Sequence, residues 1–542
     1  METECYPISV LPHASRIFLD YTERETPLTP FYPVSPRPSA WIEHPEPATF
    51  SNPSTRAQLA ELLTTQNRGY RAGEATFRNV ERLRQGARAV VTGQQVGLFG
   101  GPLYTLLKAA TAIQRAAQAT AQGHPAVPIF WMATEDHDFA EIDHLTLLDR
   151  RGLKRIQLQH NASAGSSGPA IGSSVGKLLL GPEVVQALDE AESILGSGPF
   201  LDQLRCWYRP GNTMGNAFGE LIASVFAPWG LVVMDASSRG VHQLGSEVLR
   251  RAIVDADLLH QRLLDRDIEL TKAGYHAQVL VTEGSSLLFL LDKHTGARIP
   301  LRRVEGAWKA GKRQLESEEL LEILKESPEL LSPNALLRPV FQDAVLPTLA
   351  YTGGAAEVAY FAQSDVVYRH ILGATTPILP RFSATLVEPE IATLMDRHQL
   401  SLPDAFQPPA ELAAKLGARA MPVEGKRRLA ATGKALDAEL EAVTGWMASL
   451  DQGLGRAAQT AASKMRYQMN RLRRMAAHHQ LEREASLERH AMAVSTSLFP
   501  DRHPQERVIG AAYFLSKYGD TLPSLLVDAA ADPCIGHRVL PL

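Results

Sequence analysis

The chain has 542 residues, of which 45% are hydrophobic and 21% are charged, and its formal net charge at pH 7 is −4. At ~100–200 residues per domain, this length predicts two to four domains and a sizeable buried core. The near balance of acidic and basic residues argues against a basic nucleic-acid-binding protein and against an acidic disordered tail.

The three cysteines, Cys5, Cys206 and Cys534, lie far apart and form no Cys-x-x-Cys pair. We therefore expect neither a disulfide scaffold nor a four-cysteine zinc site, and this cysteine usage fits a reducing cytosol. The first residues show no basic segment followed by an apolar stretch, and no apolar run approaches the ~18 residues of a membrane span. The sequence thus predicts a cytoplasmic protein with no membrane and no nucleic-acid partner.

Residues 1–86 begin with proline-rich segments and continue as an amphipathic stretch. In this stretch apolar residues recur at helical spacing, at Leu59, Leu62, Leu63, Phe77, Val80 and Leu83. We expect an extended arm followed by one or two helices, all packed on the core.

A strand, a glycine-rich turn, a helix and a second strand come next. The β-branched run 87–92 enters a turn at 93–102, an apolar helix follows at 103–120, and a strand at 127–132 ends on acidic residues. This order predicts a βαβ unit, and therefore a parallel sheet with helices over it.

We assign an α/β core to residues 87–387. The run 230–235 indicates a further buried strand of the same sheet. The segment 276–311 alternates with turn signals, which is typical of a small antiparallel inset. We place the insertions into the core at about 150–212 and about 275–330.

After about residue 388 apolar residues alternate by four and three along two segments, which is a heptad pattern. The first segment carries Leu429, Gly433, Leu436, Leu440, Val443, Met447 and Leu450, and the second carries Ala458, Ala462, Met465, Met469, Leu472, Ala476 and His479. Two such helices joined near Asp451 predict an antiparallel hairpin or a dimerising coiled coil over 388–498. A globular two-helix subdomain is the alternative. Residues 499–542 are expected to return to the core.

The second heptad segment also carries a cluster of basic side chains. Its members are Lys464, Arg466, Arg471, Arg473 and Arg474. We interpret the cluster as a solvated helix face in preference to a phosphate-binding surface, because such faces are common.

The first candidate site is the turn with Gly93, Gln94, Gln95 and Gly97. Glycines between a strand and a helix let the backbone approach a ligand closely, and helix N-termini attract anions. Neither of the two common phosphate-loop motifs is present, so a tight turn without a ligand is the alternative. The two adjacent amides favour a polar substrate at the carboxyl end of the strand.

The second candidate site follows the next strand, at Asp136, His137, Asp138 and His144. A histidine between carboxylates can act as a general base, because the acids support its pKa. The same four side chains could instead bind a divalent metal such as zinc. In the simplest alternative, Asp138 caps a helix that begins at Phe139.

The third candidate site comprises Arg338, Gln342, Tyr351, Gly353, Gly354, Glu357, Tyr360, Gln363 and Arg381. A Gly-Gly turn precedes a helix on which Glu357, Tyr360 and Gln363 are expected to lie roughly on one face. The two arginines are candidates for binding a carboxylate or phosphate with the guanidinium fork, although single arginines more often form surface salt bridges. Together these residues predict one wall of a pocket.

Long blocks of the chain resemble a known family. TGQQVGLFGGPLYTLLKA, PIFWMATEDHDFAEIDH, SPNALLRPVFQDAVLPTLAYTGGAAEVAYFAQ, PILPRFSAT and PQERVIGAAYFLSKYGD look like the cysteine ligase of bacillithiol biosynthesis, the BshC family. The resemblance implies a ligase that joins cysteine to glucosaminyl-malate as an amide. It also implies an α/β fold with a Rossmann-like parallel-sheet core, inserted connecting-peptide subdomains and a helical coiled-coil segment that helps to form a homodimer.

The Rossmann-like core of this family is often likened to class I aminoacyl-tRNA synthetases. The comparable helix start here, Gly101 to Lys108, has neither histidine of the HIGH motif. No KMSKS loop is evident, and Ser463-Lys464-Met465 lies in the heptad region. The usual nucleotide-activating residues of those synthetases are therefore missing.

On this interpretation ATP or another nucleotide activates the cysteine carboxylate, and Gly93 to Gly97 with Lys108 binds the anionic part. His137 accepts a proton from the amine and is oriented by Asp136 or Asp138. Further predicted substrate contacts are Tyr104, His144, Gln342, Tyr351, Gly353, Gly354 and Gln363.

Two arginines, Arg338 and Arg381, are predicted to clamp the malate carboxylates, and Glu357 to hold an ammonium group. A zinc ion that captures the thiolate through His137, Asp138 and His144 is an alternative. A metal-dependent amide hydrolase and a non-catalytic pathway scaffold are the rival functions.

Overall fold

The computed structural model describes residues 3–24, 28, 30–32, 34, 40–46, 50, 52–150, 152–158, 174–293, 296–304, 306–484 and 486–542. The chain divides into two compact units. The larger comprises residues 5–384 and 506–538, and the smaller comprises 1–4, 385–505 and 539–542. Much of the predicted proline-rich arm and residues 159–173 of the first predicted insertion lie outside the described residues.

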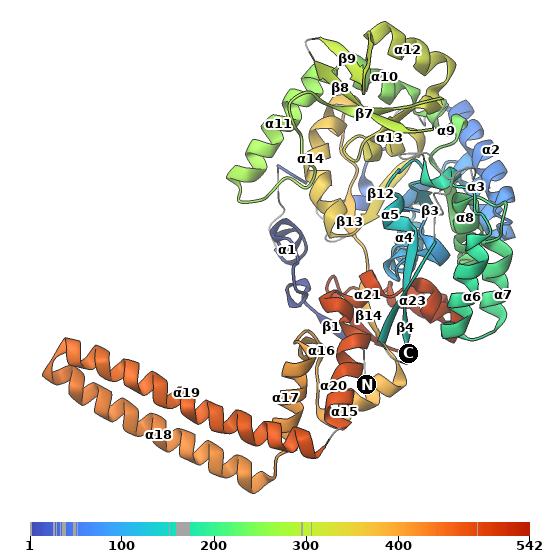
Figure 1. Cartoon of the computed structure of the whole chain (residues 1–542). Helices are drawn as coiled ribbons and strands as arrows, with labels where there is room; N and C mark the ends of the chain where they lie inside the picture. Colours follow the sequence, from blue (N-terminus) through green and yellow to red (C-terminus); the bar gives the residue numbers. More distant parts are fainter. Residues whose placement is uncertain are drawn as a thin grey trace. The chain divides into compact units, whose positions relative to one another are not determined.

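The larger unit is built on a five-stranded parallel sheet, as the βαβ pattern predicts (Figure 1). Its strands, in spatial order, are β13 (Ile378–Pro380), β12 (Thr348–Gly353), β2 (Arg88–Gln94), β3 (Ala126–Met132) and β6 (Val232–Asp235). Every adjacent pair is parallel. The α/β fold class is therefore confirmed.

Both faces of this sheet are buried, because successive side chains of a strand point to opposite sides. On β2, Ala89 and Val91 belong to a large core cluster, whereas Val90 packs in a separate cluster with Ala112 and Ala116 of the helix α4 (Tyr104–Ala121). The β-branched run of β2 thus suits a central strand.

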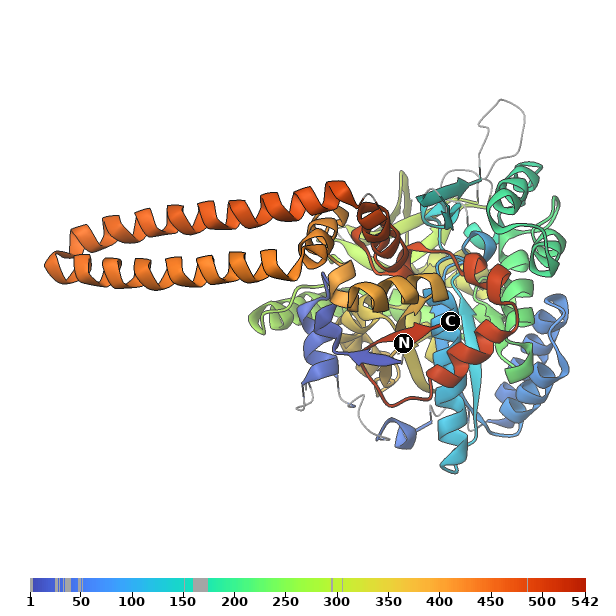
Figure 2. The same cartoon turned by 90° about the horizontal axis from the view of Figure 1, so that it is seen from below.

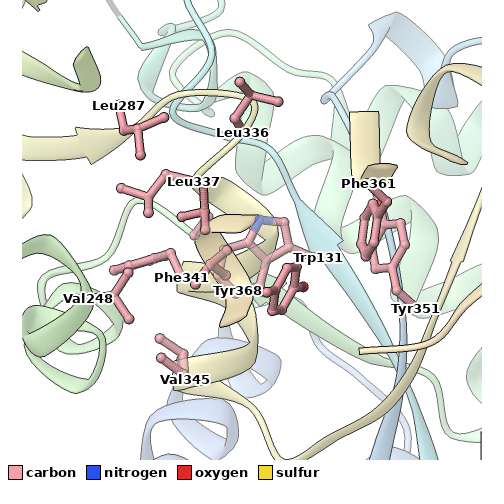
Figure 3. Packing of buried hydrophobic residues seen from close by; sticks show 14 of the residues in the cluster. Trp131, Val248, Leu287, Leu336, Leu337, Phe341, Val345, Tyr351, Phe361 and Tyr368 are labelled. Carbon is pink, nitrogen blue, oxygen red and sulfur yellow. The ribbon is translucent and has the colours of Figure 1, made fainter. Parts of the chain in front are cut away.

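Aromatic side chains fill the larger cluster near the carboxyl ends of the strands. Trp131 packs edge-on against Phe341, and Tyr351 stacks on Phe361 with ring centroids 5.3 Å apart (Figure 3). These rings fix the ends of β3 and β12 against the two helices that carry Phe341 and Phe361.

The remaining helices of the larger unit surround the sheet. They are α1 (Arg16–Glu23), α2 (Pro53–Gly69), α3 (Glu74–Arg84), α5 (Phe139–Ile142), α6 (Glu183–Leu195), α7 (Pro199–Trp207), α8 (Met214–Val225), α9 (Arg239–Leu244), α10 (Ser246–Val254), α11 (Ala256–Lys272), α12 (Ser317–Glu326), α13 (Arg338–Val345), α14 (Ala355–Ile371), α22 (Ala511–Tyr518) and α23 (Thr521–Ala529). The two amphipathic helices predicted before the core are α2 and α3, and α1 is a further helix where only an extended arm is predicted.

A second, antiparallel sheet corresponds to the predicted inset. Its strands are β7 (Ser285–Leu291), β8 (Arg298–Val304), β9 (Ala307–Ala310), β10 (Arg313–Leu315) and β11 (Leu331–Pro333), in the order β10-β9-β8-β7-β11. A two-stranded ribbon of β4 (His144–Asp149) and β5 (Gly152–Gln157) follows α5. A three-stranded sheet has the order β1 (Glu4–Tyr6), β15 (His537–Pro541) and β14 (Ser383–Val387).

One disulfide bond is not predicted by the sequence, although a single bond is not the disulfide scaffold that the cysteine spacing excludes. Cys5 and Cys534 form a disulfide bond, with their Cα atoms 6.3 Å apart. Their separation of 529 positions in the sequence gives no spacing signal, because only folding brings the two cysteines together. The approach is close: a Cβ atom at Gly536 would collide with the carbonyl oxygen of Tyr6. Cys206 is free and exposed.

The smaller unit consists largely of helices. They are α15 (Pro389–His398), α16 (Leu402–Ala405), α17 (Pro409–Ala420), α18 (Val423–Leu450), α19 (Gln452–Arg483) and α20 (Ser486–Leu498), and a short helix α21 (Gln505–Val508) begins at its end. The side chain of Asp451 accepts a hydrogen bond from the Leu454 N–H and so caps α19. Helices α18 and α19 run side by side as an antiparallel hairpin in both views (Figures 1 and 2).

The predicted heptad seam is only partly buried within the hairpin. Gly433, Ala462 and Met469 are buried, whereas Met465 and Leu472 are 52% and 54% exposed. The two helices therefore share a narrow contact line and leave apolar side chains uncovered. Among the described residues, no helix is long and apolar enough to cross a membrane.

Candidate active site

The strand order creates a crevice at one end of the parallel sheet. From β2 the chain continues to β3 and β6 on one side, and it returns much later to β12 and β13 on the other. In open parallel sheets, ligands bind outside the carboxyl ends of the strands where the order reverses in this way. The gap between the ends of β2 and β12 is therefore the expected binding position.

A cavity of about 220 Å³ lies at this position. The residues that line it are Gly93, Gln94, Gln95, Tyr104, Lys108, Trp131, Ala133, Glu141, Arg338, Pro339, Gln342, Tyr351, Gly354, Ala355, Ala356, Glu357, Tyr360, Arg381 and Arg507. The first and third candidate sites thus contribute to one cavity, whereas none of Asp136, His137, Asp138 and His144 of the second candidate site lines it.

Lys108 and Glu357, which both line the cavity, form an ion pair. Lys108 Nζ is 2.7 Å from Glu357 Oε2 and also donates to the Gly93 carbonyl oxygen, at 2.8 Å, and to Gln94 Oε1, at 3.0 Å. Burial lowers the pKa of Lys108, and Glu357 partly offsets this effect. An ammonium group has three N–H donors, and all three have acceptors here.

Glu357 is held from three directions. Besides Lys108, it accepts hydrogen bonds from the Tyr351 hydroxyl, at 2.6 Å, and from the Gly354 N–H, also at 2.6 Å. Burial would raise the pKa of Glu357, but the attraction to Lys108 and these hydrogen bonds outweigh it and the pKa is lowered. Of the roughly four acceptor positions of a carboxylate, about one is left for a substrate.

The two adjacent glutamines point in different directions. Gln94 Nε2 donates to the Tyr104 hydroxyl at 3.0 Å, and Gln95 Nε2 donates to Asp136 Oδ2 at 3.0 Å and to Glu141 Oε2 at 2.6 Å. Burial raises the pKa of Glu141, and the neighbouring Asp136 charge raises it further. Gln95 thus connects the acidic segment after β3 to the cavity.

The segment after β3 has a different geometry from that of a metal site. His137 is not a lining residue, and its Nδ1 lies 3.6 Å from Asp136 Oδ1 and 3.5 Å from a guanidinium nitrogen of Arg298. Burial would raise the pKa of Asp136, but hydrogen bonds from the Gln95 side chain and the His137 N–H lower it. Within the described parts of the chain, no three His, Cys, Asp or Glu side chains are grouped to hold a metal ion.

His144 points to a different partner. Its Nδ1 lies 2.9 Å from Asp143 Oδ1, and it is not among the lining residues. Asp138 occupies the N-cap position of α5, as the simplest alternative predicts, but its side chain makes no capping hydrogen bond.

The two predicted anion-binding arginines differ in their surroundings. Arg338, the first residue of α13, donates to the Tyr360 hydroxyl at 3.3 Å, and no described carboxylate lies within ion-pair distance of it. Arg381 instead forms a two-pronged ion pair with Glu506, with one contact of 3.1 Å. Arg381 lines the cavity as predicted, but Glu506 occupies its guanidinium fork, so its predicted contact with a malate carboxylate stays a prediction.

Three other predicted contacts lie outside the cavity. Gln363 accepts from the Val279 N–H at 2.8 Å and donates to Asp267 at 2.8 Å, because six residues along a helix turn it well away from Glu357. Gly97 and Gly353 are needed for packing: added Cβ atoms would lie 2.9 Å from the Gly101 Cα and 2.8 Å from the Glu357 Cβ, respectively.

Several lining residues were not predicted. Glu141 and Trp131 flank the candidate segment after β3, and the indole nitrogen of Trp131 is buried with no hydrogen-bond partner among the described residues. Arg507 comes from the distant segment PQERVIG, which also supplies Glu506. This segment is one of the blocks that resemble the BshC family, but nothing in its composition indicates that it lies near the end of β2.

The fold and the cavity together define a Rossmann-like α/β protein with a polar, charged site at the switch point of its sheet. Comparison with known families agrees. Residues 1–382 match the family model "Bacillithiol biosynthesis BshC, N-terminal Rossmann-like domain", and residues 384–542 match "Bacillithiol biosynthesis BshC, C-terminal coiled-coil domain". The chain belongs to the BshC family.

Curated relatives match over the full length. A protein of Koribacter versatilis named "Putative cysteine ligase BshC" is 41% identical over 540 residues, covering 100% of both chains. A protein with the same name from Solibacter usitatus is 35% identical, and the match covers 100% of both chains. Another from Salinibacter ruber is 32% identical, and the match covers 97% of this chain and 96% of the relative.

The buried Arg381–Glu506 pair predicts a specific dependence of stability on pH. Burial would raise the pKa of Glu506, but Arg381 and the hydrogen bonds to the carboxylate lower it from 4.5 to about 2. A carboxyl group with a lowered pKa stabilises the fold above its unfolded-state pKa, and this contribution is lost as the pH falls from 4.5 towards 2. The shift corresponds to about 3 kcal/mol.

We therefore expect Glu506→Gln to lower the free energy of unfolding at pH 7 and to flatten its decline between pH 4.5 and 2. Urea denaturation at a series of pH values measures both, with the highly exposed Glu74→Gln as the substitution control. If the free energy of unfolding of Glu506→Gln declined between pH 4.5 and 2 as steeply as that of the unsubstituted protein, this pair would not govern acid stability.

Proposed function

We propose that this chain is a ligase that joins the carboxyl group of cysteine to the amine of glucosaminyl-malate, forming the amide of bacillithiol. Family membership and the names of the relatives support the reaction class. The observation that carries the assignment to this cavity is the guanidinium of Arg338, which faces a polar cavity without a carboxylate partner among the described residues.

Amide formation needs a bound anion, a positioned ammonium or amine, and a proton acceptor. Arg338 is suited to bind a substrate carboxylate or a phosphoryl group, because its planar fork matches both. Glu141 and the remaining acceptor position of Glu357 can hold an ammonium group. The unpartnered indole N–H of Trp131 can donate to an oxygen of the reacting carboxyl.

The amine must lose a proton as its nitrogen attacks the activated carbonyl carbon. We retain His137 as the proposed base. His137 does not itself line the cavity, so a bridging water would carry the proton to it; Asp136 lies beside it and accepts a hydrogen bond from Gln95, which does line the cavity. Lys108 is proposed as a positioning residue, because its three donors are already used within the protein.

The cationic part of the wall also fits the phosphates of a nucleotide. Arg338, Arg507 and the first-turn N–H groups of α14 at Ala355 and Ala356 surround one side of the cavity. A bound nucleotide would supply the phosphoryl or adenylyl group that turns a carboxylate oxygen into a leaving group. The chain's own contribution is to bind those phosphates and to orient the acceptor amine.

A reconstituted reaction with cysteine, glucosaminyl-malate and ATP tests the proposal. We expect a thiol product together with an equal amount of AMP or ADP. Arg338→Met should lower kcat/KM by about 10- to 100-fold, because a charge-assisted hydrogen bond contributes about 1.5–3 kcal/mol. The kcat/KM of Arg338→Lys should lie between those of Arg338→Met and the unsubstituted protein. Arg250→Met, at an exposed position, is the matched control.

Release of cysteine from bacillithiol without nucleotide turnover would favour an amide hydrolase instead. Full activity in Arg338→Met would remove Arg338 from the proposed site, whatever the reaction proves to be.

We further propose that the protein is a homodimer formed through the hairpin. A groove of about 470 Å³ on α18 and α19 is lined by the apolar side chains Leu436, Met465, Met469, Leu472 and Met475 and by the polar side chains Gln468 and Arg471. Because three of the apolar side chains are more than half exposed in one chain, a second copy would remove apolar surface from water.

Light scattering of the purified protein is expected to give the mass of a dimer. The double substitution Met465→Lys and Leu472→Lys should give a monomer, whereas Thr460→Lys together with Ser463→Lys on the same helix serves as a charge-matched control. A wild-type monomer, or a dimer that persists in the apolar-to-lysine variant, would contradict this proposal.

A further inference from the structure

A second cavity, of about 430 Å³, lies in the larger unit on the far side of Arg381, which lines both cavities. Trp41, Leu379 and Phe382 form an apolar part of its wall, and Arg115, Arg538 and Cys534 also line it. Its size is in the range of small-molecule sites, which are apolar pockets with a few charged groups.

The two arginines make this cavity positive. Arg115 donates to Gln118 at 2.7 Å, and burial lowers its pKa. Arg538 is buried and its guanidinium stands 4.7 Å from the centre of the Phe382 ring, while its Nε has no hydrogen-bond partner among the described residues. Burial lowers the pKa of Arg538 as well, and the charge of Arg115 lowers it further.

Among the described residues, one carboxylate partly balances these charges. Asp532 Oδ1 lies 3.9 Å from an Arg538 nitrogen, and the same oxygen accepts a hydrogen bond from the Cys534 N–H at 2.8 Å. One buried and one partly buried cation against one carboxylate leave a net positive wall, and a small anion entering the cavity would compensate it.

The disulfide is part of the same wall. Cys534 is half-buried and lines the cavity, whereas its partner Cys5 is exposed and is not a lining residue. A molecule inside the cavity therefore meets Cys534 and not Cys5, so attack from the cavity would be on the Cys534 sulfur and the Cys5 sulfur would depart towards solvent. Thiol–disulfide exchange needs this access to one sulfur and an attacking thiolate.

We propose that this cavity is a docking and modification site for a low-molecular-weight anionic thiol. The incoming thiolate sulfur attacks Cys534 Sγ, a new disulfide bond forms there, and the Cys5–Cys534 bond breaks. Cys5 leaves as a thiolate and takes up a proton from water. Arg115 and Arg538 select thiols that carry carboxylates. The exchange needs no further oxidant or reductant.

The thiol made in the proposed function belongs to this chemical class, so the identity of the physiological thiol rests on that proposal. The exchange chemistry itself does not, because any small anionic thiol can test it. Ligase activity and exchange can therefore fail independently.

The test uses the full chain in its oxidised form, with Cys206→Ser to remove the free thiol. Equal thiolate concentrations of glutathione, which is anionic, and of cysteamine, which is cationic, are compared by intact mass and peptide mapping. We expect a mixed disulfide on Cys534 and exchange about tenfold faster with glutathione, because two cations attract the anion. Arg115→Gln should reduce this preference, and the exposed Arg250→Gln should not.

Arg115 is the variant of choice because it is less enclosed than Arg538, whose three carbonyl contacts hold the C-terminal segment. Four results would overturn the proposal: Cys5 and Cys534 found unpaired in non-reduced protein, an adduct only on Cys5, equal rates for the two thiols, or a glutathione preference unchanged in Arg115→Gln.

Discussion

The active-site region depends on one buried ion pair, that between Lys108 and Glu357. Moving two charges out of water costs several kcal/mol each, and the cost is offset only if both ions are fully hydrogen-bonded. Here the requirement is met by Gly93 at the end of β2, Gln94 beside it, Tyr351 near the end of β12 and Gly354 at the start of α14. The pair therefore ties together the two strands between which the sheet order reverses.

The cationic side chains around this pair are of two kinds: those paired within the protein and those that face the cavity. Lys108 and Arg381 are cations whose donors are taken by Glu357, Glu506 and backbone oxygens. Arg338 has only a tyrosine hydroxyl as its hydrogen-bond partner among the described side chains, and Arg507 lines the same cavity. A site that neutralises some cations internally and leaves others facing a cavity is suited to recognising an anionic substrate.

The βαβ unit and the helical hairpin could be predicted because both follow from local periodicity. The β-branched run before Gly93, the apolar helix after it and the heptads after residue 388 each show the spacing of one element. Side-chain partners could not be predicted in this way. Glu506 lies 125 residues from Arg381, and Cys534 lies 529 residues from Cys5, so only the folded chain shows the pairing.

The site predictions failed where helix geometry or a distant partner decided the outcome. Gln363 shares a helix with Glu357, but it turns into the core, where it is satisfied by Val279 and Asp267. Gln94, Gln95, Tyr104, Lys108, Arg338, Gln342, Tyr351, Gly354 and Glu357 do line one cavity, because the ends of parallel strands meet at one edge of the sheet.

The most direct test of the central claim is a double-mutant cycle on the ion pair, with Lys108→Met, Glu357→Gln and the double variant. Native-state hydrogen exchange of the amides in β2, β12 and α14 measures the local free energy of opening in all four proteins. We predict a coupling energy of at least about 2 kcal/mol, because each single variant leaves a buried charged partner without compensation. Effects that add within about 0.5 kcal/mol would contradict the account, since the two side chains would then contribute independently.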